Sequence, residues 1–297
     1  MRGRTAIATT ILFVVIICLF ISAPKSWRTG ASPPSVTGHY PYVKPSPLPW
    51  NPPSSKEPSG EAQADRLIVK VMLEDEDALW IDSLFPTWRK ELVTIDKRFS
   101  KLHKGGNRVD KGRIASHYLI WIIENYKNLP ETVVFLPPDQ HTQQTSQSVI
   151  WTSSGSNLKT NISNLQIAFI QSSGFANLHC PTPSRCADLI LPFRSPPNEF
   201  RTLEVAMPKV WQGIFGNTTV PEQLATAPGA EFAVSKTQVQ KRSLDEYLKF
   251  WTWLHRTPMD DDTAGLVFEH LWHVIFGRDA VFCPEEKQCE CEVYGKC

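Results

Sequence analysis

The sequence predicts an α/β domain with a partly parallel sheet flanked by helices, preceded by one transmembrane helix. Two β-branched apolar runs, at residues 66–73 and 132–136, have the length and composition of strands. Residues 112–128 lie between them and carry apolar side chains at helical spacing, as in a helix with a broad apolar face. A strand, a helix and a strand in succession predict parallel pairing through a right-handed crossover.

The other elements follow from the same patterns. Pro86 interrupts a short helical pattern in residues 78–90, and Leu129-Pro130 ends the helix that begins near Gly112. Between residues 137 and 226 the periodic signal is weak. The further strands that we expect are residues 92–95, 166–171, 188–191 and 231–235, and the further helices are residues 244–255 and 264–276.

Length and charge exclude two broad classes of protein. The chain has 297 residues, 41% of them hydrophobic, which is enough apolar material for a packed domain and excludes wholesale disorder. Its 31 basic and 30 acidic residues give a net charge of +1. Because a chain this close to neutral has no overall field to hold a polyanion, we expect no nucleic-acid partner.

The amino-terminal end predicts a membrane anchor. Residues 6–23 are uncharged and apolar, and as a helix they would span about 27 Å, close to the thickness of a bilayer core. Arg2 and Arg4 precede the run and, with the terminal amine, favour a cytosolic amino terminus. We therefore expect a cytosolic tail (residues 1–5) and a signal-anchor (6–23) that binds the membrane. A cleaved signal peptide is the alternative, although Ser22-Ala23 before Pro24 is a poor cleavage context.

A stalk and a single folded domain follow the anchor. Residues 24–60 contain ten prolines and few aliphatic side chains, which is the composition of an extended stalk. Residues 61–297 would then form a luminal or extracellular α/β domain. Such a single-pass protein would lie in the secretory pathway, in the Golgi or at the cell surface.

The cysteines and sequons fit an oxidising compartment. Six cysteines follow the stalk, an even number that predicts up to three disulfides. Cys180 with Cys186 is a plausible local pair, and the last four would staple the carboxyl terminus. Zinc ligation is the alternative, but the spacing does not match paired C-x2-C knuckles, and we expect no metal there. Asn161 and Asn217 begin N-glycosylation sequons. The disulfide candidates are Cys180, Cys186, Cys283, Cys289, Cys291 and Cys297.

A basic segment is the candidate anion site. Seven cations lie between Lys97 and Arg113, directly before the helix that begins near Gly112. Because helix amino termini and cations both attract anions, Lys111 and Arg113 are the residues that we expect to bind an anion such as a phosphate. A solvated basic loop is the alternative, since no Walker motif is present.

Two acids are candidate catalytic residues. Asp139 follows the strand at 132–136, where a nucleotide-sugar enzyme would hold a divalent metal, and a simple Pro-Pro-Asp turn is the alternative. Glu269 lies in the sequence Glu-His-Leu-Trp-His, whose order is not that of a zinc protease. Glu269 would act as a general base if buried beside a substrate hydroxyl, and a structural carboxylate is the alternative.

Several stretches resemble a fungal family of uncharacterised membrane-anchored proteins, domain of unknown function 3431. They are Lys111-Gly112-Arg113, residues 118–136, the Phe-Ala-Val-Ser run at 232–235, residues 265–277 and Cys289-x-Cys291. The likeness covers residues 67–297 and implies no established activity. In this chain Pro137-Pro138 stands where the family often has His-Gly.

Two functions are compatible with these observations. The anchor, stalk and α/β domain look like the layout of type II Golgi transferases. By fold-level analogy this gives a glycosyltransferase-A-like enzyme that uses a nucleotide sugar with Mn²⁺ or Mg²⁺. The alternative is a non-catalytic module that binds glycans or proteins, with tryptophans such as Trp151, Trp211, Trp251 and Trp253 as platforms for sugar rings.

Overall fold

The computed structural model describes the greater part of the chain after residue 64. The described residues are 65–74, 76–95, 111–138, 161–181, 186, 189–198, 200–217, 219–227 and 229–297. The expected cytosolic tail (1–5), signal-anchor (6–23) and stalk (24–60) lie outside them, as does Asp139. Within the described ranges, no helix is both long enough and apolar enough to cross a membrane.

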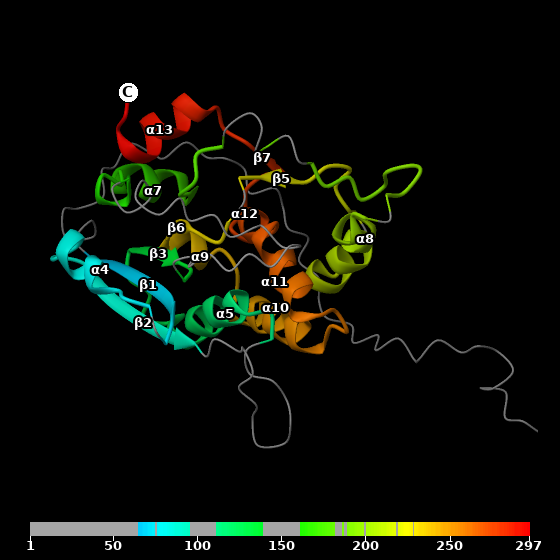
Figure 1. Cartoon of the computed structure of the whole chain (residues 1–297), viewed down its shortest axis with the longest axis horizontal. Coiled ribbons are helices and arrows are strands. Elements are labelled where there is room, and N and C mark those ends of the chain that lie inside the picture. The colour runs from blue at the N-terminus through cyan, green and yellow to red at the C-terminus, as the bar shows by residue number, and fades with distance from the viewer. Residues whose placement is uncertain are drawn as a thin grey trace, which may run out of the picture. The chain divides into compact units, whose positions relative to one another are not determined.

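A mixed sheet of five strands organises the fold, in the order β2-β1-β3-β6-β4 (Figure 1). β1 pairs in parallel with β2 and with β3, which confirms a partly parallel sheet, whereas β6 runs antiparallel to both β3 and β4. A separate small sheet pairs β5 with β7. The strands are β1 Arg66–Leu73, β2 Arg89–Ile95, β3 Thr132–Leu136, β4 Phe175–Asn177, β5 Ala225–Thr226, β6 Phe232–Ser235 and β7 Val281–Phe282.

The helices cover both faces of the sheet. Neighbouring residues of β1 alternate between two apolar clusters, as the period of a strand requires: Val69 packs with α5, α8, α10, α11 and α12, and Ile68 packs with α4, α7 and α13. The helices are α4 Leu79–Leu84, α5 Ile114–Asn125, α7 Ile167–Ser173, α8 Thr202–Phe215, α9 Lys236–Val239, α10 Leu244–Arg256, α11 Asp261–Glu269, α12 Trp272–Ile275 and α13 Glu286–Tyr294.

The structure corrects three of the expected elements. Residues 166–171, expected as a strand, belong mostly to helix α7, which ends at Gly174 with a φ of +85° and turns directly into β4. Of the expected strand at 188–191, the described part makes a single bridge, between Ile190 and Leu224. The expected helix 264–276 is two helices, α11 and α12, which are separated at His270 and Leu271.

Two of three disulfides bind the carboxyl-terminal region to the rest of the domain, and the third lies within that region. Cys291 pairs with Cys297, within the last four cysteines as expected. The expected pair of Cys180 with Cys186 is wrong, because Cys180 pairs with Cys289 and Cys186 pairs with Cys283. These two bonds bridge separations of 109 and 97 residues, which sequence spacing alone does not reveal. The disulfides indicate a secreted or luminal protein.

Candidate functional site

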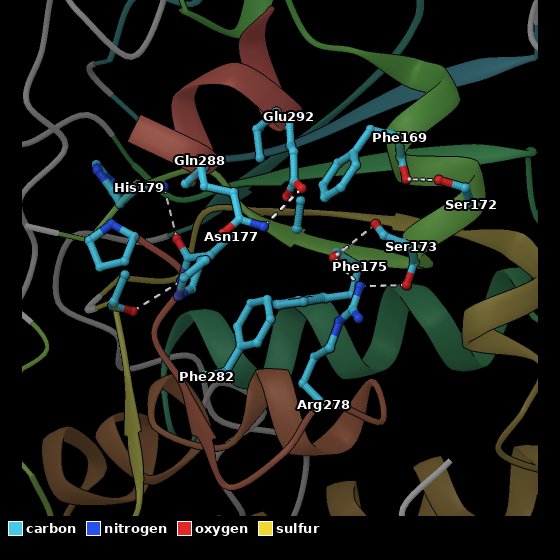
Figure 2. Close-up of a pocket in the computed structure, with 16 residues that line it drawn as sticks. Phe169, Ser172, Ser173, Phe175, Asn177, His179, Arg278, Phe282, Gln288 and Glu292 are labelled. Atoms are coloured by element: carbon cyan, nitrogen blue, oxygen red, sulfur yellow. Dashed lines mark hydrogen bonds between the residues drawn. The ribbon is translucent and has the colours of Figure 1, made fainter. Parts of the chain in front are cut away.

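A pocket of about 330 Å³ opens beside the edge strand β4. Its walls come from α7, β4, α13 and the segment 278–284, so that residues more than 100 positions apart in the chain meet there (Figure 2). The Cys180–Cys289 disulfide ties the chain after β4 to α13, and Cys289 itself lines the pocket. The pocket therefore depends on the covalent link that also holds the carboxyl terminus.

Phenylalanine rings give the pocket its apolar surface. Phe169, Phe175 and Phe282 line it, and the rings of Phe175 and Phe282 lie 6.1 Å apart in an edge-on arrangement. Phe175 is fully buried and stacks on Phe276 in the core, which fixes its position, whereas Phe282 is only half-buried. Such a surface suits a flat apolar face of a small ligand.

Two opposite charges face the same pocket. Arg278 and Glu292 reach it from opposite sides (Figure 2). The Nη2 group of Arg278 donates to the carbonyl oxygens of Ser173 and Phe175, the latter at 2.8 Å, and the Phe282 ring lies 5.2 Å from the guanidinium carbon. Burial lowers the pKa of Arg278, while the neighbouring carboxylates of Asp279 and Glu292 act to raise it. The guanidinium is therefore held in one position at the pocket wall.

The pocket also meets a buried histidine that lies beside a buried carboxylate. His179 lines the pocket, and its Nε2 atom lies 3.4 Å from a carboxylate oxygen of Glu231. Both side chains are nearly inaccessible. Glu231 directly precedes β6, and because Phe232 pairs with both Phe135 and Asn177, the pair lies at the edge where β3 and β4 end. Ligands of open α/β sheets commonly bind outside this carboxyl edge.

Behind the pair is a second polar group, here called the acid cluster and defined as Tyr118, Glu231 and Glu269. Aromatic rings surround it: Tyr118 packs against Phe135, Phe232 and Trp272. The two carboxylate oxygens of Glu269 and the Tyr118 hydroxyl have no hydrogen-bond partner among the described residues. Burial raises the pKa of Glu269 well above its usual value, and the charge of Glu231 adds to the effect. Burial likewise raises the pKa of Tyr118, with smaller contributions from Glu231 and Glu269.

Lys111 and Arg113, the expected anion-binding pair, lie elsewhere and contact the protein itself. The Lys111 ammonium donates to the carbonyl oxygen of Thr257, and Arg113 forms an ion pair with Asp262 at the start of α11. Neither residue lines the pocket. Most of the basic segment before Lys111 lies outside the described residues.

Apart from Cys289, the other predicted site residues that the structure describes do not line the pocket. Glu269 is buried in the acid cluster, and Asp139 lies outside the described residues. At the sequons, the Asn161 side chain accepts a hydrogen bond of 2.6 Å from Lys296, and the Asn217 side chain accepts one of 2.6 Å from the backbone N–H of Thr219. Trp211 is buried and Trp251 packs against the core, so neither is a platform on this pocket.

The described residues do not fit the divalent metal of a nucleotide-sugar enzyme. Among them, no group of three or more His, Cys, Asp or Glu side chains is arranged to hold a metal ion. The two acids of the acid cluster, Glu231 and Glu269, are buried. We therefore derive no step through Mn²⁺ or Mg²⁺.

The sequence of the chain matches the model of one protein family. The model for proteins of unknown function (DUF3431) matches residues 67–292, which is most of the chain. The chain belongs to this family. The match includes the acid cluster and every residue that lines the pocket except Val293. No curated protein and no solved structure matches the chain significantly.

Proposed function

We propose that the domain is a non-catalytic glycan-binding module of the secretory pathway or cell surface, carried by a single-pass anchor at residues 6–23. The observation that supports binding is the pocket of about 330 Å³, which combines phenylalanine rings with a guanidinium, a carboxylate and a side-chain amide. Sugar rings present apolar C–H faces to aromatic rings and hydroxyls to polar groups. The dimensions suit one sugar residue, since small-ligand pockets begin at about 300 Å³.

The polar groups of the pocket can receive hydroxyls. Gln288 donates to Glu292 at 3.0 Å, which leaves the amide oxygen of Gln288 and one carboxylate oxygen of Glu292 as acceptors. Asn177 is already used, because its amide donates to the carbonyl of Ala227 and its oxygen accepts from the backbone of His179. Recognition would therefore come from the polar side chains of α13 and from Arg278.

The test is ligand-observed NMR, by saturation transfer, with the full oxidised chain in detergent micelles and a panel of methyl glycosides. We expect saturation transfer to at least one sugar and its loss in Phe282→Ala. Phe193→Ala is the matched control, because Phe193 is 59% exposed and does not line the pocket. Equal signals in the two variants, or no signal with any sugar, would rule out this function for the pocket.

A glycosyltransferase that uses a nucleotide sugar is the second candidate, and one observation favours it. Glu269 is a buried acid with a raised pKa, as a general base requires, and Glu231 of the same cluster lies at the carboxyl edge of the strands. Titration calorimetry of the full chain with uridine and guanosine diphosphate sugars, with and without Mn²⁺, separates the candidates. Metal-dependent heat that Glu269→Gln alters would favour the transferase over the binding module.

A further inference from the structure

The pocket lies along an open edge of the sheet. β4 is the last strand in the order β2-β1-β3-β6-β4, so that β6 pairs with one side of it, and no strand in the described part of the chain pairs with the other. Phe282 packs with the apolar cluster on one face of the sheet and Phe169 with the cluster on the other face, and both line the pocket. The pocket therefore continues the plane of the sheet, between its two layers.

The register of β4 shows which backbone groups point into the pocket. The Gly174 carbonyl accepts from the last residue of β6 at 2.9 Å, and the Leu178 N–H donates to the residue before β6 at 3.0 Å. Because such bonds alternate along an antiparallel pair, Phe175 and Asn177 direct their N–H and C=O groups away from β6. The Phe175 carbonyl confirms this direction, since it accepts from the pocket residue Arg278.

Only part of this backbone edge is already used. The Phe175 carbonyl accepts from Arg278 at 2.8 Å and from the Ser173 hydroxyl at 3.3 Å. The side chain of Asn177 is also used, because it bonds to Ala227 and to the backbone that follows it. The backbone N–H and C=O of Asn177, however, have no hydrogen-bond partner among the residues that the structure describes. One residue of the edge strand thus offers both a donor and an acceptor to the pocket.

We infer that the pocket binds an extended peptide segment of a partner protein, one residue of which exchanges two backbone hydrogen bonds with Asn177. Extended peptides commonly bind by adding a strand to an open sheet edge. A longer added strand is not expected, because Arg278 already holds the next outward carbonyl, that of Phe175. The added strand therefore makes a single residue pair.

The walls of the pocket define the chemistry of this segment. Side chains of directly opposite residues share a face of the sheet, so the paired residue would direct its side chain to the face of Phe175 and Phe282. An aliphatic or aromatic side chain suits that surface. Arg278 and Glu292 place both signs of charge at the pocket, which suits the neutral backbone of an internal segment better than a charged chain end. The inference goes beyond the proposed function, because it depends on the backbone of β4.

The experiment compares two probes by saturation-transfer NMR titration of the full oxidised chain in detergent micelles. They are N-acetyl-L-leucine methylamide and its analogue that is methylated on the leucine nitrogen. The added methyl group removes the N–H that would donate to the Asn177 carbonyl. We expect the unmethylated probe to bind about tenfold more tightly, because the analogue loses a hydrogen bond and leaves a carbonyl unpaired. Equal affinity of the two probes, or no binding of either, overturns the inference.

Two variants test whether binding takes place at β4. Asn177→Pro removes the outward N–H, and proline is tolerated in an edge strand where that N–H is not part of the sheet. It should weaken the unmethylated probe about tenfold. Asn177→Ala is the matched control, since it loses the same side-chain hydrogen bonds, keeps the N–H and should keep the difference between the probes. Equal losses in the two variants would contradict pairing with the backbone. If Asn177→Pro does not fold, the comparison of the probes still decides.

The methyl glycosides separate this inference from the proposed function. Binding of the leucine probe without binding of any sugar overturns the glycan-binding function and leaves the peptide site standing. Binding of a sugar without binding of the probe does the reverse. If both bind, each should displace the other, because they fill the same pocket. Independent binding of the two would place the peptide elsewhere and overturn the inference.

Discussion

The pocket and the acid cluster both lie near the carboxyl edge of β3 and β4, but their polar side chains differ in hydrogen bonding and in exposure. In the pocket, Arg278 is fixed by hydrogen bonds to the backbone carbonyls of Ser173 and Phe175. In the acid cluster, Glu269 and Tyr118 are sealed among aromatic rings without partners in the described residues. The first arrangement uses covalent and hydrogen-bonded support to keep an open space. The second places Glu269 and Tyr118 where burial favours their neutral forms.

The largest effect that we expect concerns the covalent support of the pocket. Cys180→Ala with Cys289→Ala removes a link across 109 residues, and the chain-entropy relation gives a loss of about 5 kcal/mol. Cys291→Ala with Cys297→Ala removes a link across only 6 residues and should cost about 2 kcal/mol. Chemical unfolding of both double variants measures the difference. A larger loss from the short link would show that the pocket region does not depend on the Cys180–Cys289 bond.

A buried histidine between the two regions should make the domain sensitive to acid. His273 packs beside Phe282 of the pocket, its Nε2 lies 3.1 Å from the carbonyl oxygen of Ala280, and burial lowers its pKa to about 4. The unfolded chain binds the proton near pH 6.5 and the folded chain only near pH 4. Stability is therefore full above pH 6.5 and falls by about 3 kcal/mol as the pH drops to 4.

His273→Gln keeps a donor for Ala280 and removes the titration. The free energy of unfolding of this variant should depend less on pH between pH 7 and pH 4 than that of the unmodified chain. The dependence that remains should come from the acidic residues. His255→Gln is the matched control, since His255 is only half-buried on α10 and lies outside the pocket. An equal flattening in the two variants would mean that His273 is not the source of the acid sensitivity.

The acid cluster should show the opposite pH dependence. Glu269 has a higher pKa in the folded chain than its ordinary value of 4.5 in the unfolded chain. Protonated Glu269 therefore contributes its full stability below pH 4.5, and this contribution is lost as the pH rises through the folded-state pKa. Glu269→Gln, which is neutral at every pH, should raise the free energy of unfolding by about 2 kcal/mol at pH 7.5 and change it little at pH 4. Urea unfolding at the two pH values measures this. Destabilisation at pH 7.5 would show that Glu269 is held as a carboxylate by a partner.

The sequence predicted the buried sheet much better than the pocket, for a physical reason. The strand at 132–136 is an uninterrupted apolar run and the helix around Tyr118 is long, apolar and periodic, and the structure confirms both as β3 and α5. Helix α7 has seven residues, too few for a helical period to outweigh the β-branched composition, and its end is set by packing of Gly174 against Gln238. Helix α8 contains Pro208, which concealed its pattern.

The candidate site was harder still, because no local motif marks it. Glu269 was identified from its surroundings in the sequence, but its partner Glu231 is 38 positions away and became visible only through strand pairing. Arg278 contributes to the pocket through hydrogen bonds to Ser173 and Phe175, and Glu292 contributes from α13, which the Cys180–Cys289 bond ties to the chain after β4. Spacing along the chain carries no information about such contacts.

Among these variants, Phe282→Ala should lower the stability of the domain least and its affinity for sugar most. Phe282 is half-buried at the mouth of the pocket, and Phe282→Ala should cost about 1 kcal/mol, roughly half the value for a fully buried ring. The same change removes the ring beside the Arg278 guanidinium and should lower sugar affinity at least tenfold. Thermal unfolding and saturation-transfer NMR on the same sample measure both quantities. A loss of several kcal/mol would instead show that Phe282 is a core residue. The open space beside it would then be a packing gap and not a ligand site.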